Sequence, residues 1–513
     1  MSNDHPMNRP LTLWWIKKDF RLADNPALTA ALAQDERVLA VFFFEPDILA
    51  AEETSAFHVA AWCEALTALR NRLAPHGGEV LVLHMGAVAG AAYIHEKQAI
   101  RAIFSHEEIG SEVTYRRDRA FGEWTAANGV DWHELPQTGV FRGTLDRDRR
   151  AARWKAFMRA DNIPPVPDPG QLQKLSIPSD HFGEKNLPSE ALLPQNFGHP
   201  LRPDQLQYRQ AVSEPAAEAT LQSFLYERGQ CYSGGISSPN LAFTCGSRLS
   251  VHLAWGTLTA RQVYAATEAR QAEVKEADSE EAKAWKNSLR SFKSRLHWRD
   301  HFIQRLETES GMEFMPLNPA YAELPTPGDE YLERWLAGQT GWPLVDACMR
   351  CAASTGFLNF RMRAFITSVA VHSLRIDWRK ILYPTARLWA DYEPGIHISQ
   401  TQMQAGVVGI NQLRIYSPDK QLADHDREAT FVKAWVPELR EVEPKAILRH
   451  HLSPISDYPT PPVDWRENSR AMKADYYAIK TLPESRALAE EVYARHGSRK
   501  GPRRPPRKKT TTP

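Results

Sequence analysis

The stretch LWADYEPGIHISQTQMQAGVVGINQLRIYSP occupies residues 388–418. It contains too many acids, amides and glycines for an ordinary core helix, and too many large apolar residues for a disordered segment. Asp391 and Glu393 lie two residues apart before Pro394-Gly395, so a rigid turn can hold both carboxylates. Donors, acceptors and small residues that would let the backbone approach a large planar molecule follow: His397, Gly406, Gly409, Asn411 and Arg414. The pattern predicts either a polar ligand site or a buried turn that satisfies its own backbone.

The length and composition of the chain indicate a protein of two domains. At 513 residues the chain is too long for one typical core, and 42% hydrophobic residues suffice to fill two. The 15 tryptophans either stack on an aromatic ligand or fill helical cores, since a buried indole needs a partner for its N–H group.

The cysteines and the apolar runs bear on compartment and metal binding. Five cysteines at irregular spacing argue against a disulfide framework and for a reducing, cytoplasmic compartment. Cys348 and Cys351 form a C-x-x-C, which would need Cys231 and Cys245 to complete a zinc or iron–sulfur site, so we expect no metal. The longest apolar run, 38–44, is too short to span a bilayer, and we expect a monomer without a membrane partner.

Positive charge is concentrated at the C-terminus. Residues 495–513 carry eight Lys and Arg and no acid, although the net charge of the whole chain is only +1. Such a tail is expected to be disordered, and either to attract polyanions or to act only as a solubilising segment.

The first third alternates short apolar runs with helical patterns. The runs are 11–16, 38–44, 79–84 and 100–105, with a weaker fifth at 130–134. Val59, Trp62, Leu66, Leu69 and Leu73 share one helical face between two of these runs. This alternation predicts a doubly wound parallel sheet with right-handed crossovers. No G-x-G-x-x-G or P-loop follows a strand, so the usual nucleotide fingerprints are missing.

The remaining chain divides at a proline-rich stretch. Between 158 and 205 prolines recur at positions 164, 165, 167, 169, 178, 188, 194, 200 and 203, whereas helical periods dominate afterwards. We therefore predict an α/β domain over 1–157, a linker over 158–205, an all-α domain over 206–490 and a basic disordered tail over 491–513.

A second polar cluster precedes a predicted helix at Gly246-Ser247-Arg248-Leu249-Ser250. Hydroxyls and an arginine at a helix start predict either an anion site or a helix cap with a surface arginine.

Four strings together resemble the DNA photolyase and cryptochrome family: WWIKKDFRLADNPAL (14–28), TYRRDRAFGEW (114–124), TGWPLVDACMR (340–350) and STGFLNFRMRAF (354–365). The chain is identified as an atypical, bacterial-type member. The resemblance implies an α/β antenna-type domain, with room for a second chromophore of unknown identity, and an all-α domain that binds FAD.

The resemblance also assigns roles to individual residues. Residues 246–250 would hold the FAD pyrophosphate, with Gly246 in place of a threonine, and Tyr232 would contact the flavin. Asp391 would hydrogen-bond the flavin and pair with Arg363, with Glu393 nearby. His397 would face flavin N5, where an imidazole could exchange a proton within the pH range of the cell. Further cofactor-binding residues are Phe292, Arg295, Trp298, Arg299 and Phe360, and the catalytic residues are Arg361, Trp378 and His397.

The chain departs from the family pattern at several of these positions. Arg295 replaces a carboxylate that contacts the lesion, and Phe360 and Ala364 replace an Asn and a Met of the lesion pocket. Trp378 matches one member of the three-tryptophan electron chain. The positions of the other two members, at Thr401 and near Pro325, do not carry a tryptophan. Trp389 and Tyr392 could carry a substitute path.

The resemblance implies a DNA photolyase, a light-dependent carbon–carbon lyase that repairs pyrimidine photoproducts in UV-damaged DNA. Arg361 would then contact the lesion, and Arg290, Lys293 and Arg299 would contribute to the DNA-binding surface. The alternative is a cryptochrome-type blue-light receptor that signals through a partner. The replaced residues favour either this receptor or an atypical branch of repair enzymes. A flavin oxidoreductase that uses no light is disfavoured by the missing nicotinamide motif.

Overall fold

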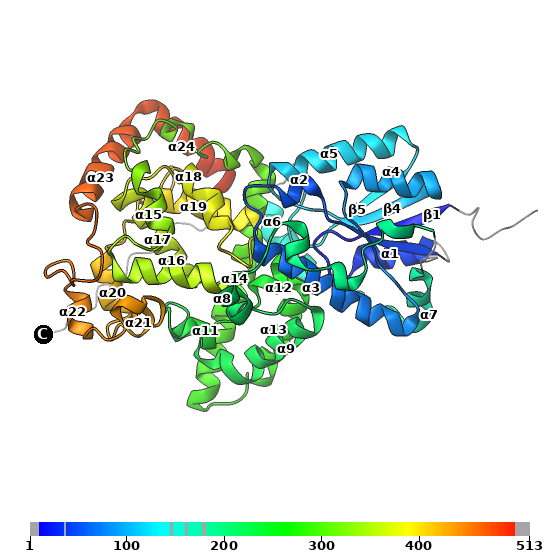
Figure 1. Cartoon of the computed structure of the whole chain (residues 1–513), viewed down its shortest axis with the longest axis horizontal. Helices are drawn as coiled ribbons and strands as arrows, with labels where there is room; N and C mark the ends of the chain where they lie inside the picture. Colours follow the sequence, from blue (N-terminus) through cyan, green and yellow to red (C-terminus); the bar gives the residue numbers. More distant parts are fainter. Residues whose placement is uncertain (1–9, 35–36, 144–146, 160–162, 177–180, 498–513) are drawn as a thin grey trace, which may run out of the picture.

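The computed structural model describes residues 10–34, 37–143, 147–159, 163–176 and 181–497, and Figure 1 shows an α/β half beside a helical half. The first half contains a five-stranded sheet in the order β3-β2-β1-β4-β5, with every pair parallel. Its strands are β1 (Leu11–Trp15), β2 (Val38–Phe43), β3 (Leu81–Leu83), β4 (Ile100–His106) and β5 (Asp131–Leu135). The predicted doubly wound α/β fold is confirmed, and all five predicted strands are present.

Helices cover both faces of the sheet because the strand side chains alternate. Trp14 of β1 packs with α1 (Pro26–Gln34) and α3 (Ala56–Leu73) in one core. Leu13 and Trp15 point the other way, against α4 (Ala87–Lys97) and α5 (Glu112–Ala127). The short α2 (Pro46–Leu49) follows β2. The carboxyl ends of the strands all meet at one edge of the sheet.

The proline-rich segment is laid over the α/β domain. It contains α7 (Pro169–Leu172), 3-10 turns and α8 (Pro203–Tyr208). Apolar side chains of this segment enter the cores of the first domain: Leu172, Leu175, Phe182, Leu192 and Phe197. The preceding α6 (Arg147–Met158) instead packs on the helical domain, where the indole of Trp154 donates to Asp300 at 2.9 Å. The boundary predicted at 157 therefore follows a helix that already belongs to the second core.

The described part of the chain after Leu135 contains helices and no strand. The helices up to the long α14 are α9 (Glu214–Ser223), α10 (Tyr232–Gly235), α11 (Ala242–Cys245), α12 (Ser250–Trp255), α13 (Ala260–Glu273) and α14 (Glu280–Thr308). The next are α15 (Leu332–Leu336), α16 (Pro343–Thr355), α17 (Phe360–Ser368), α18 (Trp378–Ala386) and α19 (Pro394–Ala405). The last are α20 (Pro418–His425), α21 (Thr430–Trp435), α22 (Pro444–Leu448), α23 (Trp465–Thr481) and α24 (Pro483–His496).

Helix α24 corrects the predicted start of the tail. Residues 491–496 are helical, Val492 is buried, and Arg495 and His496 both contact Glu309. The apolar side chain of Val492, the Arg495 ion pair and the hydrogen bond between His496 and Glu309 hold the last turn against the domain. The basic composition of the segment did not predict these contacts. The rest of the predicted tail, 498–513, lies outside the described residues.

Helices α14 and α19 pack closely at Gly395. A Cβ atom at this position would lie 2.5 Å from the Cα of Ile303, so only glycine permits this approach. The two later glycines of the opening stretch serve the fold and not a ligand. Gly406 ends α19 with a φ of 83° beside Tyr476, and Gly409 lies against Asn318. The prediction that these two glycines admit a planar molecule is therefore wrong.

The domains are joined by buried polar contacts at the first strand-to-helix turn. Arg21 donates to the carbonyl of Gly256 at 2.9 Å, and Asp24 pairs with Arg261. The carboxylate of Glu214 accepts from the backbone N–H of Leu22 at 3.1 Å. These polar groups satisfy one another at the interface between the two halves.

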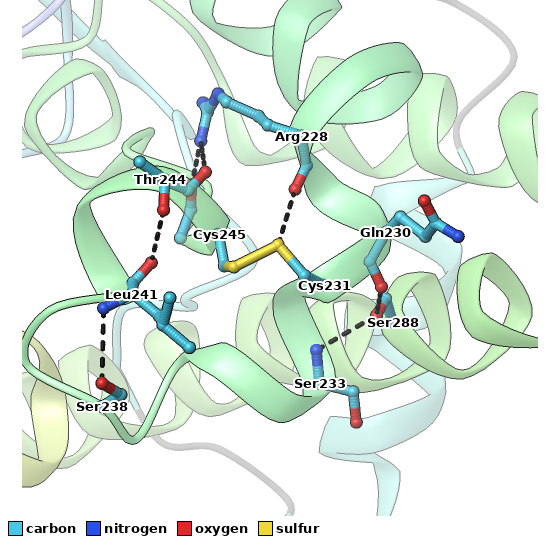
Figure 2. The surroundings of a disulfide bond; sticks show 10 residues. Arg228, Gln230, Cys231, Ser233, Ser238, Leu241, Thr244, Cys245 and Ser288 are labelled. Atoms are coloured by element: carbon cyan, nitrogen blue, oxygen red, sulfur yellow. Dashed lines mark hydrogen bonds between the residues drawn. A yellow bond between two sulfur atoms is a disulfide. The ribbon is translucent and has the colours of Figure 1, made fainter. Parts of the chain in front are cut away.

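One pair of cysteines forms a disulfide, which the irregular spacing of the cysteines did not predict. Cys231 and Cys245 are bonded with their Cα atoms 5.3 Å apart (Figure 2), whereas Cys63, Cys348 and Cys351 are free and buried. The short helices α10 and α11 fold the intervening chain back, which spacing alone does not reveal. The pairing also removes Cys231 and Cys245 from any metal site with Cys348 and Cys351. No helix of the described residues is long and apolar enough to cross a membrane.

Candidate functional site

The centre of the site is an ion pair between Arg363 of α17 and Asp391 of the turn before α19. Arg363 Nη2 lies 2.8 Å from Asp391 Oδ1 and 3.1 Å from Oδ2, and Arg363 Nε donates to the carbonyl of Leu358 at 2.8 Å. The guanidinium also lies over the Trp389 ring, 4.2 Å from its centroid. The predicted ion pair is therefore present. Its carboxylate keeps lone pairs for a further hydrogen bond.

Arg248 provides a partly buried cation nearby. Its guanidinium carbon lies 3.7 Å from the centroid of the Phe357 ring, and its Nη1 is buried without a hydrogen-bond partner among the described residues. Burial lowers the pKa of Arg248 to about 10. A buried N–H donor without an acceptor is costly, so this atom of Arg248 suits an anionic ligand. Helix α12 has only 6 residues, and the charge of this site comes from Arg248.

The segment around Arg248 is held in an unusual backbone conformation. Arg248 has a φ of 60°, and its carbonyl accepts from Gln210 at 2.8 Å. Arg228 donates to the carbonyls of Gly246 and Ser247, the latter at 2.6 Å. A Cβ atom at Gly246 would lie 2.4 Å from the carbonyl oxygen of Ala242, which explains a glycine where the family has threonine.

The other two members of this motif differ in exposure. Leu249 is buried in the core beneath α12, whereas Ser250 is exposed at its first turn. Ser247 Oγ accepts from the backbone N–H of Leu249 at 3.4 Å. Leu249 therefore anchors the motif, and its two hydroxyls remain close to solvent.

Tyr232 and Phe292 form an aromatic wall with their ring centroids 5.6 Å apart. Both are buried, and burial raises the pKa of Tyr232 while the neighbouring Arg295 opposes that rise. Arg295, which is itself exposed, thus lies beside the Tyr232 hydroxyl. The residue that replaces the lesion-contacting carboxylate contributes positive charge next to a predicted flavin contact.

His397 differs from its predicted behaviour. Its Nε2 lies 2.7 Å from the carbonyl of Leu382, which can only accept, so Nε2 carries the proton and Nδ1 is an acceptor. Burial lowers the pKa of His397 to about 4. The expectation that this imidazole titrates within the range of the cell is therefore wrong, because burial disfavours its charged form. His397 presents a neutral ring of fixed tautomer.

Glu393 and Arg299 form a second ion pair, at 3.2 Å, at the start of α19. Arg299 also contacts Asp300 at 2.9 Å. Burial raises the pKa of Glu393, and Arg299 opposes that rise. The guanidinium of Arg299 is thus committed to acids inside the protein, and its predicted place in the DNA-binding surface is wrong. Of the two other basic residues predicted there, Lys293 pairs with Glu268 at 3.2 Å and Arg290 is exposed.

Two large aromatic side chains near these elements remain open to solvent. Trp298 of α14 is 48% exposed and stacks on Phe302, and Phe360, the first residue of α17, is 57% exposed. Arg361 follows it, with a buried Nε that has no partner among the described residues. Ala364 is buried one turn further along α17. The exposed rings can stack on a molecule that arrives from solvent.

The predicted electron-chain residues lie in the core. Trp378 begins α18 and Thr401 lies on α19, each 4% exposed. Tyr392 instead stacks on His58, with ring centroids 5.5 Å apart, and His58 lies 5.3 Å from Trp255. Sequence reasoning missed His58 and Trp255 because they come from distant segments that meet only in the folded chain.

A cavity of about 80 Å³ lies at the carboxyl ends of β1 and β2. Aromatic rings and charged side chains line it, among them Trp15, Trp62, Trp255, Tyr392, Glu108 and Arg117. A cavity of this size holds only a few water molecules, so a chromophore as large as a flavin would require the lining side chains to move. Tyr392 and Pro394 reach this cavity from the segment that carries Asp391.

These observations fit FAD. Arg248 offers an open charged donor to a phosphate, the Asp391 carboxylate offers an acceptor to a ring N–H, and His397 offers a neutral edge. Tyr232 and Phe292 supply apolar surface. The residues that would hold the cofactor thus come from α10, α12, α14, α17 and α19 and the turns before α12 and α19, and α14 contacts both α10 and α19.

Comparisons with known proteins point in the same direction. The family model for the FAD binding domain of DNA photolyase matches residues 292–478, and that for DNA photolyase matches residues 12–153. A deoxyribodipyrimidine photo-lyase of Thermus thermophilus is 30% identical, over 84% of this chain and 94% of its own length. A cryptochrome DASH of Gloeobacter violaceus is 27% identical, over 92% of this chain and 97% of its own.

Solved structures share the fold. A bacterial class III photolyase from Agrobacterium tumefaciens superposes with a TM-score of 0.78 at 22% identity, covering 94% of this chain and all of that one. An archaeal photolyase from Sulfolobus tokodaii gives a TM-score of 0.73 at 22% identity, covering 91% of this chain. The motifs, the paired helices around Arg363 and Asp391 and the full-length relatives agree, and the chain belongs to the FAD-binding DNA photolyase and cryptochrome family.

Proposed function

We propose that this protein is a DNA photolyase that repairs pyrimidine photoproducts in UV-damaged DNA under blue light. Bound reduced FAD supplies the light-driven electron transfer to the lesion. The residues of the chain hold the cofactor, admit a flipped nucleotide and keep water away from both. The relatives named deoxyribodipyrimidine photo-lyase, which match over nearly their whole length, support this activity.

The observation that carries the proposal is the half-exposed pair of rings, Trp298 and Phe360. They lie on α14 and α17, the helices that also carry Phe292 and Arg363 of the proposed FAD site. A base taken out of a duplex loses its stacking, and an aromatic ring compensates by about 1–3 kcal/mol per base. We therefore assign Trp298 and Phe360 to the lesion and not to the cofactor.

We accordingly assign the basic residues to contacts with the lesion, with the cofactor or with the DNA backbone. Arg361, with its unpaired Nε, would contact the lesion or its phosphate. Arg290 and Arg295 are exposed on α14 and would contact phosphates of the DNA strand. Cofactor contacts are left to Tyr232, Phe292, Arg363, Asp391, Glu393, His397 and residues 246–250.

The second candidate function is a cryptochrome-type photoreceptor that binds FAD without repair. Buried Thr401 interrupts the expected series of tryptophans, and the cryptochrome DASH relative covers the chain as fully as the photolyases do. A signalling partner would then replace damaged DNA.

A repair assay separates the two functions. Purified protein is illuminated with duplexes that carry a defined cyclobutane dimer or (6-4) photoproduct, beside a dark control, and restored bases are counted. Trp298→Ala should weaken binding to the lesion by about 1–3 kcal/mol. Trp465→Ala, which alters a partly buried tryptophan on α23, is the matched control. Repair of neither lesion by FAD-loaded, photoreduced protein would refute the photolyase proposal and leave the photoreceptor.

We also propose that the cavity at the strand ends accepts a second chromophore. Its aromatic and charged lining and its nearness to the Asp391 segment support this, and the Sulfolobus tokodaii photolyase is described with two FAD molecules. We also propose a division into an α/β domain, a proline-rich segment that ends at 205 and a helical domain that extends through α24, which limited proteolysis of the FAD-loaded protein would test.

A further inference from the structure

The disulfide joins the two segments assigned to FAD. Cys231 directly precedes Tyr232, and Cys245 directly precedes Gly246 and Ser247. Figure 2 shows Arg228 reaching across the same junction, with its guanidinium toward the Thr244–Cys245 end. One covalent bond therefore fixes the distance between a predicted flavin contact and the predicted phosphate segment.

The two ends of this link are anchored differently. On the Cys231 side, Ser288 of α14 donates to the carbonyl of Gln230 at 2.7 Å and accepts from the N–H of Ser233 at 3.1 Å. On the Cys245 side, the phosphate segment is held by hydrogen bonds from Arg228 and Gln210 to its carbonyls. Without the disulfide, the first end stays fixed to a long helix. Residues 246–248 lie between the last turn of α11 and buried Leu249, and the side chains of Arg228 and Gln210 hold their carbonyls.

The disulfide is also the redox group that solvent can reach. Cys231 is exposed and Cys245 is buried. The three remaining cysteines, all among the described residues, are buried thiols, and burial raises the pKa of Cys63 and of Cys351 to about 12. Such thiols react slowly, because the thiolate is the reactive form.

We infer that the Cys231–Cys245 pair is a thiol–disulfide exchange site that controls how tightly the protein retains FAD. An external dithiol attacks Cys231 Sγ as a thiolate, the S–S bond breaks, and Cys245 leaves as a thiolate. The second thiol of the dithiol then resolves the mixed disulfide. The protein pair gains two electrons and two protons, and the dithiol becomes a disulfide.

Reduction loosens the phosphate segment and so lowers the population in which Arg248 is placed for a phosphate. A site that is only partly populated binds more weakly by the same fraction. We expect reduction to weaken FAD binding about tenfold, within the usual range of coupling between two sites. Coupling is reciprocal, so bound FAD should make the disulfide about tenfold harder to reduce, a shift of about 30 mV for a two-electron couple.

The experiment uses the full-length, FAD-loaded protein in the dark, with and without dithiothreitol. Alkylation and mass measurement after unfolding count the free thiols, which should rise from the 3 of the oxidised chain by two on reduction. Release of FAD on dilution is followed by flavin fluorescence, and should become about tenfold faster. Cys231→Ser should release FAD as the reduced wild type does and ignore dithiothreitol. Cys63→Ala, which keeps the disulfide, should respond as the wild type does.

The inference rests on the proposed FAD role of residues 246–248, and its failure can be told apart from failure of that role. Two new thiols with an unchanged rate of FAD release would overturn the inference and leave the proposed function intact. A disulfide that native dithiothreitol treatment cannot reduce would overturn it as well. If Cys231→Ser folds poorly, the rate of FAD release from the wild type with and without dithiothreitol tests the inference by itself. Loss of FAD binding in Arg248→Met with the disulfide intact would support the phosphate assignment independently.

Discussion

Replacing Asp391 tests the centre of the site. The side chain of Arg363 is 24% exposed and that of Asp391 is 11% exposed. Asp391→Ala removes both contacts to Arg363 Nη2 and the expected acceptor for the flavin. Water still reaches Arg363 before FAD binds, so most of the penalty arises when the cofactor covers the unpaired guanidinium.

The magnitude follows from this partial exposure. Removing one partner of a fully buried pair costs about 3–5 kcal/mol, and exposure reduces this to roughly 2–3 kcal/mol here. At 1.4 kcal/mol per factor of ten, the Kd for FAD should rise about 30- to 150-fold. Fluorescence titration of the apoprotein with FAD measures that change directly.

A matched control separates the site from a general loss of charge. Asp424 pairs with Lys420 on the exposed face of α20, at 3.0 Å, with both side chains largely in solvent. Asp424→Ala should leave the Kd for FAD unchanged and alter stability by less than about 0.5 kcal/mol. An Asp391→Ala protein that binds FAD as tightly as the control does would refute the placement of the flavin at Asp391.

Three further expectations concern packing, pH and charge. Gly395→Ala should destabilise the protein by at least about 1–3 kcal/mol, because the added Cβ atom would clash with Ile303. The Tm should fall accordingly, and an unchanged Tm would contradict the close packing of α14 and α19. Burial lowers the pKa of His58, His252 and His372 to about 4 each, below the unfolded value, so stability is complete above pH 6.5 and declines as the pH falls toward 4. As the pH falls from about 7 to about 5, each of these histidines should lower the free energy of unfolding by on the order of 2 kcal/mol. Urea titrations of His372→Gln should therefore show a smaller decline in stability over this pH range than those of the wild type. Deleting residues 498–513 spares the contacts of Arg495 and His496. The slope of log K against log salt concentration for undamaged DNA should become shallower by about 0.9 for each phosphate contact that is lost. Equal slopes would show that the tail acts only as a solubilising segment.

The sequence predicted the features that repeat along the chain. Buried apolar runs and a helical stripe from Val59 to Leu73 are local patterns, and the five strands and α3 follow from them. Arg363 and Asp391 could be paired only through the family resemblance, since nothing local relates positions 28 residues apart. The same resemblance could not reveal the exposure of Trp298 or the internal ion pair of Arg299, because both depend on how α14 lies against α19.

Titration and covalent pairing were the least predictable properties. The pKa of His397 depends on burial and on the Leu382 carbonyl, neither of which its own sequence neighbours indicate. The Cys231–Cys245 bond depends on two short helices that bring the residues together, and the irregular spacing of the cysteines suggested the opposite. Both errors concern groups whose chemistry is decided by tertiary contacts.

The segment from Trp389 to Pro394 couples the two proposed chromophore sites. The carbonyl of Trp389 lies 2.9 Å from His58 Nε2, and the carbonyl of Ala390 accepts from the Trp255 indole at 2.7 Å. Asp391 turns to Arg363, whereas Tyr392 and Pro394 line the cavity at the strand ends. Because a few consecutive residues serve both proposed sites, we expect a chromophore that displaces Tyr392 to shift the backbone that positions Asp391. A chromophore bound in the first domain should therefore alter the affinity for FAD. A substitution at His58 or Trp255 should also alter that affinity, although neither residue is among the proposed FAD contacts.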